Sequence, residues 1–193
     1  MIAGCDVAYD EQFAYAAWVV LSFPELTEVD IAHARTPISA EYRPGFFAER
    51  ELPPLLAAFA ELRTVPDVVL CEGAGIAHPR RFGLACALGQ TVDLPTIGCA
   101  KSRLTGVALE PGPFRGDWAP LLIEGERVGT VLRTRSHVRP LYVSPGYKIT
   151  LIDSWRIVLA ACRNYRLPEP LRLAHSESRR LRLTSGLPGR LER

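Results

Sequence analysis

Apolar and β-branched residues fall into three consecutive segments at the start of the chain. Residues 2–9 (IAGCDVAY), 13–21 (FAYAAWVVL) and 27–35 (TEVDIAHAR) are joined by short polar connections, and the third segment alternates weakly between apolar and polar positions. Successive short strands with short connections pair as neighbours. This pattern predicts an antiparallel meander of three strands.

The pattern changes in the middle of the chain. Apolar residues recur at helical spacing over 49–63, which predicts an amphipathic helix. The apolar segments 67–72 and 95–99 predict two buried strands, with a helix over 79–89 between them. Alternation of strand and helix favours parallel pairing with right-handed crossovers.

The C-terminal part is predicted to contain a hairpin, a brief strand and two helices. These cover 119–124 with 128–134, then 141–143 before the breaker Ser144-Pro145-Gly146, then about 150–163 and about 168–182. From Thr184 the chain is rich in Gly, Pro and Arg, and we expect a flexible tail over 184–193. The order of elements predicts one α/β domain over 1–183. Its fold is ribonuclease H-like, a mixed central sheet of an antiparallel meander plus parallel strands, flanked by helices.

Composition adds limits on the class of protein. The 193 residues are 48% hydrophobic, enough for one folded domain, and the net charge of +2 by itself predicts no polyanionic partner. Eight arginines and three acids follow from residue 163 onward. This basic segment is either a phosphate-binding surface or a solvated face.

The five cysteines show no CxxC spacing, and most lie in apolar segments. They predict buried free thiols in a reducing compartment rather than disulfides or a zinc site. The sequence shows no secretory leader pattern, and no apolar run approaches the roughly 20 residues of a membrane span. We therefore expect a cytoplasmic monomer with no membrane partner.

Three acids stand in positions that suggest shared chemistry. Asp6 interrupts an apolar strand, Glu72 ends another, and Glu51 follows a turn at the start of a helix. A buried carboxylate is costly unless it is paired or binds a metal, and Mg²⁺ prefers carboxylate oxygens. Simpler explanations stay open: an ion pair for Asp6, a loop cap for Glu72, and a favourable helix-start charge for Glu51.

Further polar groups follow these acids. The loop Gly73-Ala74-Gly75 leads toward Arg80 and Arg81 at a helix start, where an anion could bind, although such a loop is more often a turn. Lys101 follows the strand 95–99 at its carboxyl end, a usual place for ligand groups as well as for solvated lysines. His175 shares a helix face with Arg172 and Arg179, where it could reach a phosphate or water, or lie in solvent.

Six segments in order resemble the endonuclease V family over about residues 2–180. They are Ala3–Tyr9, Tyr42–Glu51 (YRPGFFAERE), Glu72–Gly83 (EGAGIAHPRRFG), Pro95–Ser102 (PTIGCAKS), Tyr142–Gly146, and Tyr165–His175. The resemblance implies a ribonuclease H-like endonuclease dependent on Mg²⁺, or alternatively Mn²⁺. It implies DNA repair by cleavage of the second phosphodiester 3′ to inosine or another deaminated base, with DNA or RNA as the nucleic acid.

The same resemblance assigns residues by position. Asp6, Glu51 and Glu72 would bind the metal, His175 would position or activate water, and Lys101 would stabilise the transition state. Tyr42 and Pro44 would fill the gap left by an extruded base. A tight pocket for that base would be lined by Gly45, Phe47, Gly73, Gly75, His78 and Gly83.

The sequence departs from the family pattern in three places. Glu72 stands where Asp is usual, and Ala74 replaces a common polar residue. The sequence begins at the first strand, whereas family members commonly carry an extra N-terminal helix, so either the helix is absent or the start codon was assigned late. The first two changes motivate an alternative, a catalytically weakened relative that binds inosine-containing nucleic acid without efficient cleavage. A different ribonuclease H-like nuclease is a third hypothesis, against which the Tyr-x-Pro-Gly segment counts.

Overall fold

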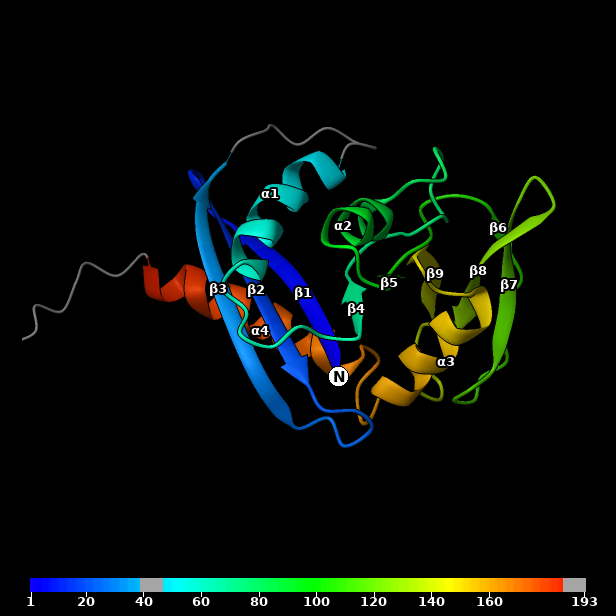
Figure 1. The fold of residues 1–193 in the computed structure, drawn as a ribbon. Coiled ribbons are helices and arrows are strands. Elements are labelled where there is room, and N and C mark those ends of the chain that lie inside the picture. The colour runs from blue at the N-terminus through cyan, green and yellow to red at the C-terminus, as the bar shows by residue number, and fades with distance from the viewer. Residues whose placement is uncertain (39–46, 186–193) are drawn as a thin grey trace, which may run out of the picture.

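A single mixed sheet forms the centre of the structure, a computed structural model that describes residues 1–38 and 47–185 (Figure 1). Within this part of the chain the strand order is β3-β2-β1-β4-β5-β9-β8-β7-β6. The strands are β1 Ile2–Tyr9, β2 Phe13–Leu21, β3 Glu28–Pro37, β4 Val68–Cys71, β5 Thr96–Ala100, β6 Val107–Ala108, β7 Trp118–Ile123, β8 Glu126–Leu132 and β9 Leu141–Tyr147. The helices are α1 Phe47–Phe59, α2 Leu84–Val92, α3 Leu151–Ala161 and α4 Glu169–Ser185.

The predicted mixed sheet is confirmed. β1, β2 and β3 pair antiparallel as a meander, and β1–β4 and β4–β5 pair in parallel. The crossover from β4 to β5 contains α2, as the alternation of strand and helix predicted. The parallel strands β1, β4 and β5 therefore end at the same edge of the sheet.

Several predicted boundaries were wrong. β9 continues through Ser144-Pro145-Gly146, because the register shift opposite it, between Thr96 and Ile97 of β5, lets a proline enter the ladder. The second helix starts at Leu84 instead of 79, after a turn in which Arg81 has φ of 53°. The last helix runs to Ser185, so the first two residues of the expected tail are helical.

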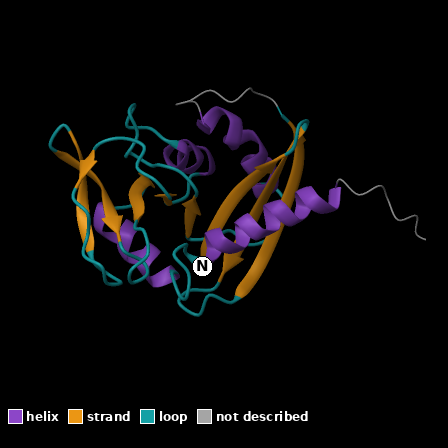
Figure 2. Cartoon of the chain, turned by 180° about the vertical axis from the view of Figure 1, so that it is seen from behind, coloured by secondary structure: helices purple, strands orange, loops and turns teal. Residues whose placement is uncertain are grey.

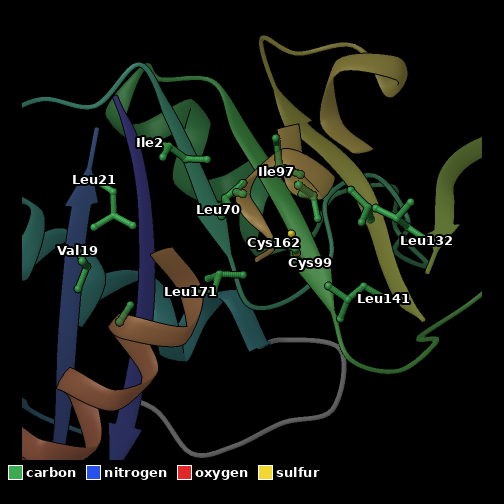
Figure 3. Close-up of a cluster of buried hydrophobic side chains, with 14 residues drawn as sticks. Ile2, Val19, Leu21, Leu70, Ile97, Cys99, Leu132, Leu141, Cys162 and Leu171 are labelled. Carbon is green, nitrogen blue, oxygen red and sulfur yellow. The ribbon is translucent and has the colours of Figure 1, made fainter. Parts of the chain in front are cut away.

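Helices cover both faces of the sheet, as the views from the front and from behind show (Figures 1 and 2). The face under α1 and α2 is packed by small and aliphatic residues, among them Ala3, Leu55 and Leu88. The opposite face packs against α3 and α4 through a second cluster that includes Ile2, Leu70 and Leu171 (Figure 3). Alternate residues of β1 thus face opposite helix layers.

The contact between β1 and α4 leaves no space for a side chain at Gly4. A Cβ atom there would lie 2.2 Å from the carbonyl carbon of Pro170 and 2.5 Å from the backbone nitrogen of Leu171. The first turn of α4 therefore rests directly on the backbone of β1. This approach brings the side chains that follow along α4 close to the end of the strand.

All five cysteines are free and buried, as predicted. None of the helices in residues 1–38 and 47–185 combines the length and apolar character needed to cross a bilayer.

Gly4→Ala should destabilise the fold by about 3 kcal/mol or more, since the new methyl group meets backbone atoms that cannot rotate away. Urea unfolding followed by circular dichroism measures the loss. Gly125→Asn is the matched control, because a Cβ at Gly125 would meet nothing within 4 Å and asparagine tolerates its φ of 81°. Equal stability of wild type and Gly4→Ala would contradict the close packing of α4 on β1.

Candidate active site

The shared edge of the parallel strands brings together three charged groups that are distant in sequence. Asp6 lies on β1 and Glu72 directly follows β4, and the neighbouring residues Cys5 and Cys71 are register partners. Lys101 directly follows β5, and its Nζ lies 2.7 Å from each carboxylate oxygen of Glu72. These three residues therefore lie together at one edge of the sheet.

Helix α4 adds two groups to Asp6 from the other side. Nδ1 of His175 lies 3.3 Å from Oδ2 of Asp6, and the hydroxyl of Ser178 donates a hydrogen bond of 2.6 Å to the same oxygen. Ser178 is fully buried, whereas the side chain of His175 is 36% exposed. Ser178 therefore fixes the Asp6 carboxylate from within the core, and His175 lies between Asp6 and the solvent.

Asp6, Glu72 and His175 form a group that could hold a metal ion. One ligand atom from each lies within 4.8 Å of the others, in a search of the described residues. Carboxylate oxygens suit Mg²⁺ and Mn²⁺. Burial raises the pKa of Asp6 despite its hydrogen bond from Ser178 and the nearby His175. A cation there would offset the cost of burying this charge, so the donor set fits a divalent ion.

Glu51 reaches the same region from the opposite helix layer. It lies on α1, is 6% exposed, and accepts a hydrogen bond of 2.8 Å from the Tyr9 hydroxyl. Burial is the main cause that raises its pKa to about 8, with Asp6 and Glu72 adding repulsion. Glu51 is not within the 4.8 Å group, so the ligand set of Asp6, Glu51 and Glu72 stays a prediction.

A cleft of about 410 Å³ joins these residues. Its walls carry both charge types, namely the carboxylates of Asp6, Glu51 and Glu72 and the guanidinium groups of Arg50, Arg179 and Arg182. His175 and Tyr9 also line it. A substrate in this cleft would contact both charge types, which suits a phosphate ester bound to a cation.

A second cavity of about 340 Å³ borders the first at Glu72. Gly73, His78 and Gly83 line it, as predicted for the base pocket, together with Ala74 and Lys101. Gly75 serves a different contact, since a Cβ there would lie 2.0 Å from the Pro145 carbonyl oxygen. The glycine loop therefore packs directly against the backbone of β9.

Four of the predicted site residues lie wholly or partly outside the part of the chain that the structure describes. Tyr42, Pro44 and Gly45 lie outside the described residues, and so does the side chain of Phe47, the first residue of α1. The predicted wedge and part of the predicted pocket therefore stay predictions.

Sequence reasoning missed Ser178 and Tyr9. Ser178 lies on the apolar stripe of the last helix, with Leu171 and Ala174, where a lone hydroxyl needs a partner. Tyr9 ends β1 three residues after Asp6 and therefore faces the other layer, where Glu51 lies. The lone hydroxyl on an apolar stripe and the odd–even spacing along β1 were the available signals.

Comparison with known proteins gives a consistent result. The sequence profile of the family described as Endonuclease V matches residues 1–176. An Endonuclease V from Roseiflexus sp. (strain RS-1) is 50% identical over 173 residues, covering 90% of this chain and 78% of that protein. The crystal structure of Endonuclease V from Streptomyces avermitilis superposes with a TM-score of 0.92 at 43% identity, covering 96% of this chain and 82% of that one.

A third similar structure contains nucleic acid. It is Endonuclease V from Ciona intestinalis in complex with a 24mer DNA containing an inosine followed by a ribo-adenosine. The TM-score is 0.80 at 27% identity, over 95% of this chain and 86% of that one. These structural neighbours confirm the predicted ribonuclease H-like fold.

The raised pKa of Glu51 makes the stability of the metal-free protein depend on pH. The neutral acid is favoured in the folded state, so its contribution is present below the unfolded pKa near 4.5 and is lost as the pH rises through about 8. Glu51→Gln should therefore stabilise the protein in chelator by about 2–4 kcal/mol at pH 9 and change little at pH 5. Urea unfolding at both pH values measures this difference.

Glu61→Gln is the control, because Glu61 is exposed just beyond the end of α1. A gain for Glu51→Gln that is the same at pH 5 and pH 9 would show that Glu51 is ionised in the folded protein.

Proposed function

Because this chain belongs to the endonuclease V family, we propose that it is a divalent-metal-dependent endonuclease that acts in DNA repair. The proposed reaction is hydrolysis of the second phosphodiester 3′ to inosine or another deaminated base. The observation that carries the proposal is the group of Asp6, Glu72 and His175, whose ligand atoms lie within 4.8 Å of one another. The inosine-containing DNA bound to the Ciona intestinalis relative supports the substrate class.

Asp6 and Glu72 would hold the cation, with Glu51 as a further carboxylate in the cleft. When bound there, a divalent cation would supply Lewis-acid chemistry to water and to the attacked phosphate. Mg²⁺ is the proposed ion and Mn²⁺ the alternative. Ser178 keeps one Asp6 oxygen fixed through its hydrogen bond, so the carboxylate is oriented before any ligand arrives.

His175 and Lys101 would act on water and on the phosphate. Since Nδ1 of His175 faces Asp6 at 3.3 Å, Nε2 is the nitrogen available to orient the attacking water. The Lys101 ammonium is held 2.7 Å from Glu72, beside the group that could hold the metal. There its positive charge would stabilise the extra negative charge of the transition state.

The cavity beside Glu72 would receive the base after extrusion from the helix. Gly73 and Ala74 line this cavity, and the methyl side chain of Ala74 offers no hydrogen bond to a base. Burial and the nearby Arg80 lower the pKa of His78, which favours the neutral imidazole on this wall. Such a pocket would recognise a deaminated base largely through its shape and backbone contacts.

Purified protein should nick an oligonucleotide that contains one inosine, at the second phosphodiester 3′ to it, with Mg²⁺ or Mn²⁺ and not in excess chelator. Gel electrophoresis against size markers identifies the position, and parallel DNA and RNA substrates reveal the preferred nucleic acid. Asp6→Asn should reduce the rate by at least about 100-fold, as expected for loss of a charged metal ligand. Absence of cleavage at every metal concentration would reject the proposal.

A weakened, binding-only relative is the second candidate, and Glu72 is the observation that favours it. Both Glu72 oxygens already contact Lys101 at 2.7 Å, so the carboxylate is shared between lysine and cation. We expect Glu72→Asp to slow cleavage, because the shorter side chain retracts from a site arranged for glutamate. A large gain in cleavage rate for Glu72→Asp would instead support the weakened relative.

A further inference from the structure

Two arginines of α4 line the catalytic cleft and have no part in the proposed chemistry. Arg179 and Arg182 follow His175 by four and seven residues, a spacing that keeps all three on one side of the helix. Both belong to the walls of the cleft that contains Asp6, Glu51 and Glu72. A row of positive charge therefore continues from His175 along α4.

Arg179 differs from the other arginines of α4 in its contacts. Arg172 and Arg180 on the same helix are bound to Glu169 at 2.7 Å and Glu177 at 2.6 Å. Within residues 1–38 and 47–185, Arg179 makes no hydrogen bond and no ion pair. Arg179 thus keeps its five N–H donors for a ligand in the cleft.

Arg182 is held at the far end of this row. Its Nη1 donates a hydrogen bond of 3.1 Å to the carbonyl oxygen of Tyr9, the last residue of β1. This contact fixes its guanidinium at the C-terminal end of β1, and its other donors have no hydrogen-bond partner among the described residues. The guanidinium of Arg182 is therefore held in place before a ligand binds.

A nucleic-acid strand brings more than one phosphate into such a cleft. Lys101 would offset the charge of the phosphate that is cleaved, as would a cation held by Asp6 and Glu72, whereas the three carboxylates would repel the neighbouring phosphates. Binding of those neighbours requires cationic donors, and the planar guanidinium matches two phosphate oxygens. Arg179 meets this need on the wall formed by α4.

We propose that Arg179, with Arg182 beside it, binds a backbone phosphate of the substrate strand adjacent to the cleaved one. Helix α4 then has two roles, since His175 serves the chemistry and Arg179 holds the strand. This inference rests on the proposed nuclease function and adds the residue that sets the position of the strand.

The test compares Arg179→Ala with Arg180→Ala, which removes the same charge from the same helix outside the cleft. Binding of a fluorescent inosine-containing DNA duplex is followed by anisotropy with Ca²⁺ in place of Mg²⁺, after cleavage under these conditions is shown to be absent. Arg179→Ala should weaken binding roughly 5- to 20-fold at low salt and reduce the slope of log affinity against log salt by about 0.9. Arg180→Ala should stay within about twofold of wild type.

A series of duplexes, each with one phosphate replaced by an uncharged methylphosphonate, identifies the contact. Wild type should lose affinity when the phosphate bound by Arg179 is neutralised, and Arg179→Ala should be insensitive at that same position. In cleavage with Mg²⁺ the loss should fall on KM, with kcat close to that of wild type. Arg179→Lys should retain part of the affinity.

Unchanged affinity and salt slope in Arg179→Ala would overturn the inference, and so would a defect confined to kcat. In both cases, cleavage of the inosine substrate by the wild-type protein would still support the proposed function. If wild type neither binds nor cuts the inosine duplex, the proposed function fails and this inference fails with it.

Discussion

The backbone contact between Gly4 of β1 and the first turn of α4 determines where the catalytic groups can lie. Because residues 2, 4 and 6 of β1 face α4, the strand that accepts the helix at Gly4 presents Asp6 one step further along. His175 and Ser178 then meet Asp6 one to two turns along the helix. A wider separation would break both contacts at once, so packing of the core and geometry of the site depend on the same approach.

This arrangement concentrates carboxylates where water is partly excluded. Burying their charge costs free energy, and the surrounding groups offset this cost to different extents at Asp6, Glu51 and Glu72. Ser178 and His175 favour the charged form of Asp6, yet burial still raises its pKa. Glu51 accepts a hydrogen bond from the Tyr9 hydroxyl, which favours its charged form, yet burial still raises its pKa to about 8. Glu72 is the more accessible of the three and contacts Lys101 directly. The protein by itself leaves the buried carboxylates incompletely compensated, and a divalent cation would supply the missing charge.

Much of the fold and part of the site could be predicted from the sequence, because the periodicity of each strand and the order of elements along the chain can be read directly from it. Asp6 interrupts one apolar strand, Glu72 and Lys101 directly follow two others, and the C-terminal ends of parallel neighbours lie at one edge. Contacts that depend on how a helix rotates on the sheet were not predictable. Ser178 is 172 residues from Asp6, and only the packing of α4 reveals that they meet. The extension of β9 through Pro145 depends on a register shift in its partner strand, which no local pattern shows.

The two helix layers divide the site in a way that explains the position of Glu51. Asp6 and His175 belong to the face under α4, whereas Glu51 comes from α1 on the other face and is held by Tyr9, an odd-numbered residue of β1. The acids therefore approach the sheet edge from both sides, and their separation depends on how α1 and α4 pack on one strand. Glu51 therefore lines the same cleft as Asp6 and Glu72 although it is not part of the 4.8 Å group. Its raised pKa allows it to hold a proton there.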